Sequence, residues 1–107
     1  MGNFKGFGGG GMNMQAMMKQ AQKLKEDMER AQQELADAEL EGTAGGGLVT
    51  VTLSGKKKLL AVRIKPEAAD PDDVEMLEDL ITAAHHDAFT KAEELEKEKL
   101  GSYARMM

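Results

Sequence analysis

The sequence predicts an α+β fold in which a long helix, a small antiparallel sheet and a second long helix follow one another. The first observation is an apolar seam from Met14 to Ala38 at alternating steps of three and four residues, a spacing typical of a coiled-coil-like helix. The second is a short, glycine-punctuated segment of alternating apolar and polar residues. The third is another helical seam, from Val74 to Leu95. Two long helices attached to so little sheet indicate a partner chain rather than an enzyme pocket.

The composition supports one domain at most. The 107 residues include three Phe, one Tyr and no Trp, so few large side chains are available for a core. We predict a flexible glycine-rich tail over 1–11, a single folded domain over 12–100 and a frayed tail over 101–107. Cysteine is absent, and no apolar run approaches the roughly 20 residues that span a bilayer. We therefore expect a soluble, cytoplasmic protein without disulfides.

The first helix is predicted over 12–38, where good helix formers such as Ala, Met, Gln, Lys, Glu and Leu dominate. Methionine occupies seam positions where a rigid core prefers Leu or Ile, so this seam is adaptable. We expect the two seams to form core or dimer contacts rather than a ligand groove. The residues assigned to a dimer interface are Met17, Ala21, Leu24, Met28, Leu77, Ile81, Ala84 and Ala88.

Three strands are predicted between the helices. An edge strand covers 39–44, and strand 48–54 places Val and Leu on one face and Thr and Ser on the other. Residues 54–57 read as a hairpin turn. The third strand, 59–65, is predicted to point its apolar residues inward and its basic residues outward, namely Leu60, Val62 and Ile64 against Arg63 and Lys65.

The second helix has a clear predicted start. Asp70 is expected to be its N-cap, Pro71 to lie in its first turn, and Asp72 and Asp73 to lie at the positive end of its dipole. The helix is predicted to run to about residue 100, where a glycine can cap it.

No residue pattern supports catalysis or metal binding. The glycine run 42–47 leads into a strand and lacks the Gly-Lys-Ser/Thr of a phosphate loop. His85 and His86 are adjacent on a helix, so their side chains diverge by roughly 100° and cannot chelate one ion. The carboxylates are explained by helix capping and by pairing with lysines. We therefore expect no catalytic residue, no metal, no cofactor and no small-molecule substrate.

The net charge of −5 is distributed unevenly. Residues 1–25 hold four lysines and no acid, and residues 42–66 hold five basic residues and no acid. Local potential matters more to a polyanion than total charge, because salt screens charges beyond about 10 Å. The candidate phosphate-binding residues are Lys19, Lys23 and Lys25 in the first helix and Lys56, Lys57, Lys58, Arg63 and Lys65 in the hairpin. The sequence leaves open which of these surfaces would contact a polyanion.

Three segments carry a likeness to a known family: MMKQAQK at 17–23, EGTAGGGLVTV at 41–51 and DPDDVEMLEDL at 70–80. Together they resemble the YbaB/EbfC family of bacterial nucleoid-associated proteins, over roughly residues 12–100. The resemblance implies a tweezer-like homodimer of α-β-β-β-α subunits whose sheets form a shared body. It also implies non-catalytic binding of double-stranded DNA that alters DNA conformation, in the cytoplasm on the nucleoid. His85-His86 departs from the family, which more often has an apolar residue followed by Asn.

Two functions stay open at the level of the residues. The first is DNA binding through the phosphate backbone and shape, because no recognition-helix motif is available to read bases. The alternative is a non-catalytic helical module for protein–protein interaction, which the acidic balance and the methionine seam support. A membrane partner is disfavoured, because both seams lack bulky anchors such as Trp and Phe.

Overall fold

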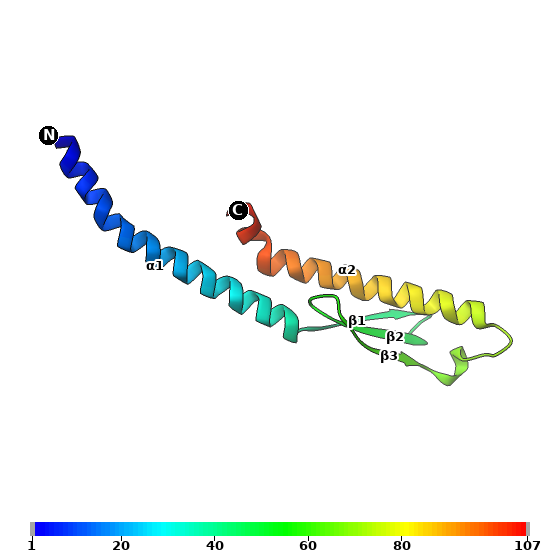
Figure 1. The fold of residues 1–107 in the computed structure, drawn as a ribbon. Coiled ribbons are helices and arrows are strands. Elements are labelled where there is room, and N and C mark those ends of the chain that lie inside the picture. Colours follow the sequence, from blue (N-terminus) through cyan, green and yellow to red (C-terminus); the bar gives the residue numbers. More distant parts are fainter. Residues whose placement is uncertain (1, 107) are drawn as a thin grey trace. The chain divides into compact units, whose positions relative to one another are not determined.

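A computed structural model describes residues 2–106, with the side chains of residues 13–101 and of Tyr103 (Figure 1). The chain divides into two compact units, Met1–Arg30 and Ala31–Met107. Its elements are helix α1 (Gly2–Asp37), strands β1 (Glu39–Ala44), β2 (Val49–Ser54) and β3 (Leu59–Ile64), the short 3₁₀ helix η1 (Pro66–Ala68) and helix α2 (Val74–Met106). The predicted order α-β-β-β-α is confirmed.

The sheet is antiparallel with the strand order β1-β2-β3. Val49, Val51 and Leu53 of β2 are fully buried and form the centre of the core, while Thr52 and Ser54 on the other face of the strand are also buried, at 5% and 4%. Helix α2 runs along this face of the sheet (Figure 1), and Ala84 and Ala88 are buried against it. The alanine seam of α2 therefore belongs to the core of this chain.

Helix α2 approaches β1 so closely that only glycine fits at position 42. A Cβ atom built on Gly42 would collide with the backbone of Ala84 and Ala88. Ala84 and Ala88 on α2 and Gly42 on β1 thus form one packing contact, since their small size lets the two backbones come close together.

We expect Gly42→Ala to lower the free energy of unfolding by about 1–3 kcal/mol, because helix backbone cannot move aside as a flexible side chain does. Urea unfolding followed by circular dichroism measures this loss. Gly101→Ala is the matched control, because a Cβ there meets nothing within 4 Å and Ala favours a helix by about 0.5–1 kcal/mol. Equal stability of Gly42→Ala and the wild type would contradict the close contact.

The apolar residues of β3 are not buried within one chain, although Val62 and Ile64 pair with Val51 and Val49 and lie on the predicted side of the sheet. All six residues of β3 are exposed, with Leu60, Val62 and Ile64 at 46%, 40% and 39%. The physical reason is width: a helix about 10 Å across covers about two strands spaced ~4.8 Å apart, and α2 lies over β1 and β2. The third strand is left uncovered on the side of the sheet that faces α2.

A β-bulge further changes the predicted alternation. The register shifts between Thr52 and Leu53, so that Leu53 pairs with Leu59 and the following pair is Thr52 with Ala61. Leu60 is the extra residue, which explains why Leu59 and not Leu60 shares a face with Leu53.

The outer edge of β1 is fastened by side chains of α2. The backbone N–H of Thr43 donates to Asp87 Oδ2 at 3.1 Å, and Lys91 Nζ donates to the carbonyl oxygen of Glu41 at 2.7 Å. Asp87 and Lys91 also form an ion pair with each other at 3.6 Å. Both β1 and β3 are edge strands. The outer edge of β1 therefore has part of its hydrogen-bonding capacity satisfied, whereas no described side chain bonds the backbone of β3.

Helix α2 begins three residues later than the sequence predicts, because Asp73 and not Asp70 caps it. The Asp73 carboxylate accepts the backbone N–H of Met76 at 3.2 Å, and the helix starts at Val74. Asp70 instead closes the preceding turn, where its side chain accepts the N–H of Asp72 at 2.9 Å. The predicted flexibility of 1–11 and 101–107 stays a prediction, and Met1 and Met107 lie outside the described residues.

An ion pair joins the last turns of α1 to α2. Lys99 Nζ lies 2.6 Å from Glu34 Oε2, and this hydrogen bond raises the pKa of Lys99 above its ordinary value of 10.5. Because the pKa is raised by folding, the stabilisation is complete below the ordinary pKa and is lost as pH rises through the higher value.

Candidate nucleic-acid interface

The basic residues of α1 lie on more than one side of the helix. Lys19 and Lys23 are exposed and four residues apart, so they share a face. Neither forms an ion pair with a described side chain, and their ammonium groups are available to an external anion. This pair is the strongest candidate for phosphate contact among the described side chains of residues 13–30.

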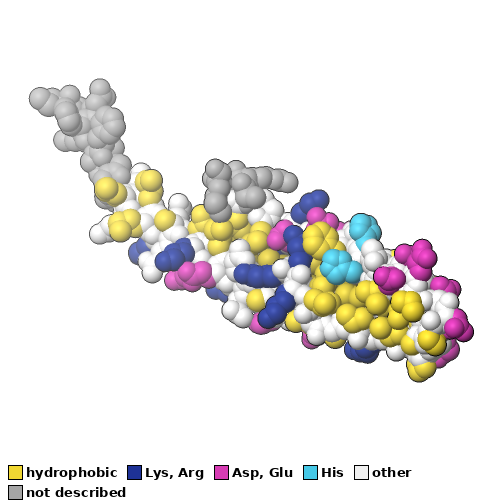
Figure 2. Space-filling view, turned by 45° about the vertical axis from the view of Figure 1, so that its right-hand side comes forward, with side chains coloured by type: hydrophobic (Ala, Val, Ile, Leu, Met, Phe, Trp, Pro, Cys, Tyr) yellow, Lys and Arg dark blue, Asp and Glu magenta, His cyan; other side chains and the backbone are white. Residues whose placement is uncertain are grey.

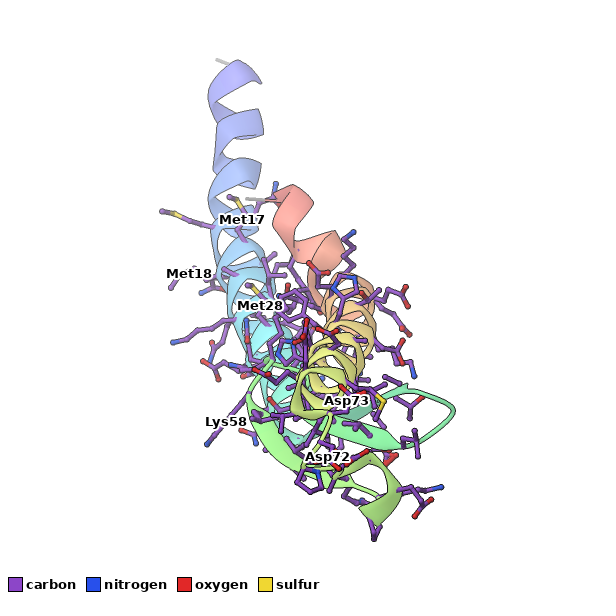
Figure 3. All side chains as sticks on the ribbon, turned by 90° about the vertical axis from the view of Figure 1, so that its right-hand side faces the viewer. Met17, Met18, Met28, Lys58, Asp72 and Asp73 are labelled. Atoms are coloured by element: carbon purple, nitrogen blue, oxygen red, sulfur yellow. The ribbon has the colours of Figure 1, made fainter. Side chains whose placement is uncertain are left out.

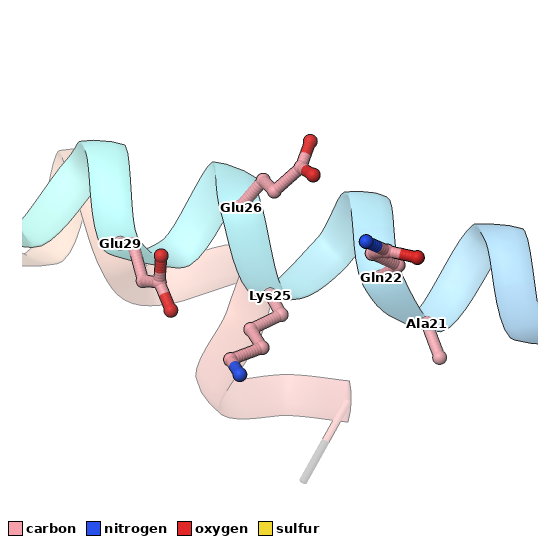
Figure 4. A pocket seen from close by; sticks show the side chains of 5 residues that line it. All are labelled: Ala21, Gln22, Lys25, Glu26 and Glu29. Carbon is pink, nitrogen blue, oxygen red and sulfur yellow. The ribbon is translucent and has the colours of Figure 1, made fainter.

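Lys25 projects from another side of α1, about 200° around the helix from Lys23. It lies in a shallow hollow with Ala21 and Glu29 along the same side of the helix, and Glu26 points away from it (Figure 4). Glu29 is one turn from Lys25, so a carboxylate accompanies this ammonium group. Lys25 therefore lies on a different side of α1 from Lys19 and Lys23, although it too forms no ion pair with a described side chain.

The tip of the β2–β3 hairpin is held by Ser54. Its Oγ accepts the backbone N–H groups of Lys56 at 3.2 Å and of Lys58 at 3.1 Å, and its carbonyl oxygen accepts the N–H of Lys57 at 2.8 Å. Lys56 and Lys58 are exposed, and the side chain of Lys58 extends away from the sheet (Figure 3). The hairpin thus presents two lysines from an ordered turn.

Lys57 is placed differently from its two neighbours. Its Nζ lies 3.2 Å from Glu96 Oε1 and 5.3 Å from the centroid of the Phe89 ring, both on α2. Its side chain is 27% exposed. Among the three lysines of the tip, this one is engaged inside the chain.

Arg63 and Lys65 line a shallow hollow together with Gly47, Thr50, Ile64 and Pro66. Arg63 pairs with Thr50 across the strands, so it lies on the face of the sheet opposite the core residues Val49 and Val51. Both basic residues are exposed. This position matches the predicted polar, basic face of the hairpin.

The structure does not bring the predicted hairpin residues into one cluster. Lys58 precedes β3 and Lys65 follows it, and a six-residue strand separates its ends by about 20 Å. The basic residues of the hairpin therefore form two surfaces, one at the tip and one at the far end of β3.

The residues predicted for the dimer interface lie in different environments. Ala84 and Ala88 are fully buried within the chain, and Leu77 and Ile81 are half-buried beside the same core. Met17 is 64% exposed and points away from α1 (Figure 3). The remaining three are Ala21, which is exposed, and Leu24 and Met28, which are half-buried.

An uncovered apolar surface adjoins the core on β3 and α2. Leu59 and Val74 are each 54% exposed, in addition to the apolar residues of β3 named above. Figure 2 shows apolar side chains gathered on the unit Ala31–Met107, beside the two histidines. Sequence reasoning missed the exposure of this surface because strand alternation does not show which strands a helix covers.

His85 and His86 are both exposed, and the ring of His85 stacks on Phe89 with centroids 6.0 Å apart. Within the described residues, no group of three His, Cys, Asp or Glu side chains lies close enough to hold a metal ion. None of the described helical residues form a stretch long and apolar enough to cross a membrane.

Comparisons with known proteins identify the family and agree with this fold. The model of the YbaB/EbfC DNA-binding family matches residues 9–107. A nucleoid-associated protein of Alkaliphilus metalliredigens is 52% identical over 99 residues, which cover 91% of this chain and 87% of that protein. A nucleoid-associated protein of Saccharopolyspora erythraea is 54% identical over 93 residues, which cover 87% of this chain and 80% of that protein.

Among solved structures, an uncharacterized protein from Helicobacter pylori shares the fold, with a TM-score of 0.69 at 19% identity. The match covers 85% of this chain and 94% of that one. The fold thus defines a small α+β protein in which a three-stranded antiparallel sheet follows one long helix and precedes another. The chain belongs to the YbaB/EbfC DNA-binding family.

Proposed function

We propose that this protein binds double-stranded DNA as a homodimer, mainly through the phosphate backbone and DNA shape, and alters DNA conformation on the nucleoid. The observation that carries the proposal is a set of exposed lysines in acid-free segments that form no ion pair with a described side chain: Lys19 and Lys23 on α1, and Lys56 and Lys58 at the hairpin tip. Membership of a DNA-binding family supports the same conclusion.

The proposed mode of binding follows from the residue types. Ammonium groups are compact charges on flexible stems, and they neutralise phosphates without the fixed planar geometry of a guanidinium. Affinity should therefore depend strongly on salt and weakly on sequence. The surface at Arg63 and Lys65 is a second candidate contact, because both side chains line one hollow on the polar face of the sheet.

The homodimer is proposed from the uncovered side of the sheet. Leu59, Val62 and Ile64 are apolar and exposed, and water contact of so much adjoining apolar surface is unfavourable. The free edge of β3 adds backbone groups that a second copy can satisfy. With Leu77 and Ile81 at its border, this surface would join two sheets into the shared body that the family resemblance implies.

A titration of random-sequence duplexes at several salt concentrations tests the proposal. If two copies place Lys19, Lys23, Lys56 and Lys58 on phosphates, log K falls with log salt with a slope of roughly −7. Light scattering is expected to give the mass of a dimer, and duplexes labelled at both ends are expected to change their end-to-end distance on binding. A flat salt dependence would contradict the phosphate contacts.

The exposed methionines favour a second candidate function, a helical module that binds another protein. Met14, Met17 and Met18 are 64–69% exposed on α1, and methionine surfaces adapt to varied apolar partners. Under this alternative, capture of a partner protein would survive charge reversal at Lys19 and Lys23.

A further inference from the structure

The backbone of Lys57 has an unusual conformation. Its φ is 69°, the one positive value among the described non-glycine residues. Residues other than Gly, Asn and Asp avoid this region, because their Cβ crowds the following carbonyl. Such a conformation persists when the surrounding contacts determine it, so the contacts of Lys57 should explain why it is tolerated.

Two side chains of α2, Phe89 and Glu96, make those contacts, and they lie about two helical turns apart. The Lys57 ammonium is 3.2 Å from the Glu96 carboxylate and 5.3 Å from the Phe89 ring centroid. Phe89 in turn packs against the buried core and stacks on His85. The hairpin tip is therefore fastened to α2 through the side chain of Lys57.

Lys56 and Lys58 flank this attachment and have the opposite character. Their side chains are exposed, while their backbone N–H groups share the hydroxyl oxygen of Ser54. Fixing Lys57 thus fixes the turn from which both neighbours project. A phosphate placed on Lys57 would also approach the Glu96 carboxylate, which repels it.

We infer that Lys57 is a positioning residue, which holds the hairpin tip so that Lys56 and Lys58 meet DNA phosphates, and that its own ammonium group contacts none. The inference rests on the proposed DNA-binding function. Preorganisation of this kind raises affinity because the tip does not have to be ordered when DNA binds.

The test compares three matched variants, Lys56→Gln, Lys57→Gln and Lys58→Gln, in the salt titration of a random duplex. A lysine that contacts phosphate lowers the magnitude of the slope by about 1.8 when replaced, because a dimer loses two contacts of about 0.9 each. We expect this loss for Lys56→Gln and Lys58→Gln. For Lys57→Gln we expect an unchanged slope and an affinity lower by about three- to tenfold at every salt concentration.

Glu96→Gln supplies a second test, in which the direction of the change in DNA affinity is diagnostic. This variant keeps the inference testable if Lys57→Gln does not fold. Removing an acid ordinarily strengthens binding to a polyanion. If Glu96 acts by holding Lys57, the variant instead binds more weakly than the wild type. Tighter binding of Glu96→Gln, or a slope loss for Lys57→Gln equal to that of its neighbours, would overturn the inference.

The wild type separates failure of the inference from failure of the proposed function. If log K of the wild type hardly changes with log salt, the proposed function itself is contradicted. If the wild-type slope is steep and Lys57→Gln binds with unchanged affinity, DNA binding stands and the positioning role of Lys57 is contradicted. Dimer mass and unfolding midpoint of each variant confirm that the folded dimer is compared throughout.

Discussion

Replacement of both Lys19 and Lys23 by Glu is expected to abolish DNA binding, with a loss of affinity of about 100-fold or more near 0.1 M salt. The two ammonium groups share one face of α1 and form no ion pair with a described side chain. A dimer would lose four phosphate contacts and gain four carboxylates that repel DNA. Fluorescence anisotropy of a labelled duplex measures the change.

Lys97→Glu is the matched control for a single reversal, Lys23→Glu. Lys97 is also an exposed helical lysine, but it lies among the acids of α2, so its reversal should change affinity by less than about threefold. Equal losses in the two variants would show that net charge, and not the face of α1, governs binding. Retained capture of a partner protein by the double variant would favour the interaction-module alternative.

Replacement of Val62 by Glu is expected to convert the dimer into monomers. Val62 is 40% exposed on the uncovered side of β3, and a carboxylate there would be buried without a partner if two copies meet on this surface. We expect the dimer dissociation constant to rise by at least about 100-fold, which corresponds to about 2.7 kcal/mol. Sedimentation or light scattering across a dilution series measures it.

Ala61→Glu is the control on the same strand. Ala61 pairs with Thr52, so it lies on the opposite face of the sheet from Val62. The same carboxylate on this face should leave the dimer intact. Dissociation by both substitutions would place the interface elsewhere or along the whole strand, and dissociation by neither would contradict the proposed surface.

Local patterns were sufficient to predict the order of the elements. The alternation of Val49, Val51 and Leu53 depends on the two-residue period of a strand, and the periodic Ala residues of α2 depend on the helical repeat. Both periods are properties of the backbone. They could therefore be read without knowing what each face contacts.

The predictions that failed depend on contacts distant in sequence. Whether Val62 is covered depends on the width of α2 relative to the sheet, which periodicity does not contain. The start of α2 moved because Asp70 and Asp73 are both good capping residues, and their actual roles depend on the turn between them.

The same limit applies to single residues of the candidate site. Residues 56–58 are all lysines, yet only Lys57 forms an ion pair with Glu96, which lies 39 residues away in the sequence. No local motif links these positions. The lysines of α1 were easier to sort, because their faces follow directly from helical spacing.

The hydrogen bonds between α2 and the outer edge of β1 limit how many copies of the chain can associate through their sheets. A strand from another molecule that added to this edge would first have to displace the Asp87 and Lys91 side chains from the backbone of Thr43 and Glu41. The edge of β3 carries no such barrier in the described chain. In the proposed homodimer, pairing through β3 would use up the one edge of each sheet that is free to pair. We therefore expect association to stop at two copies and not to extend into a fibre.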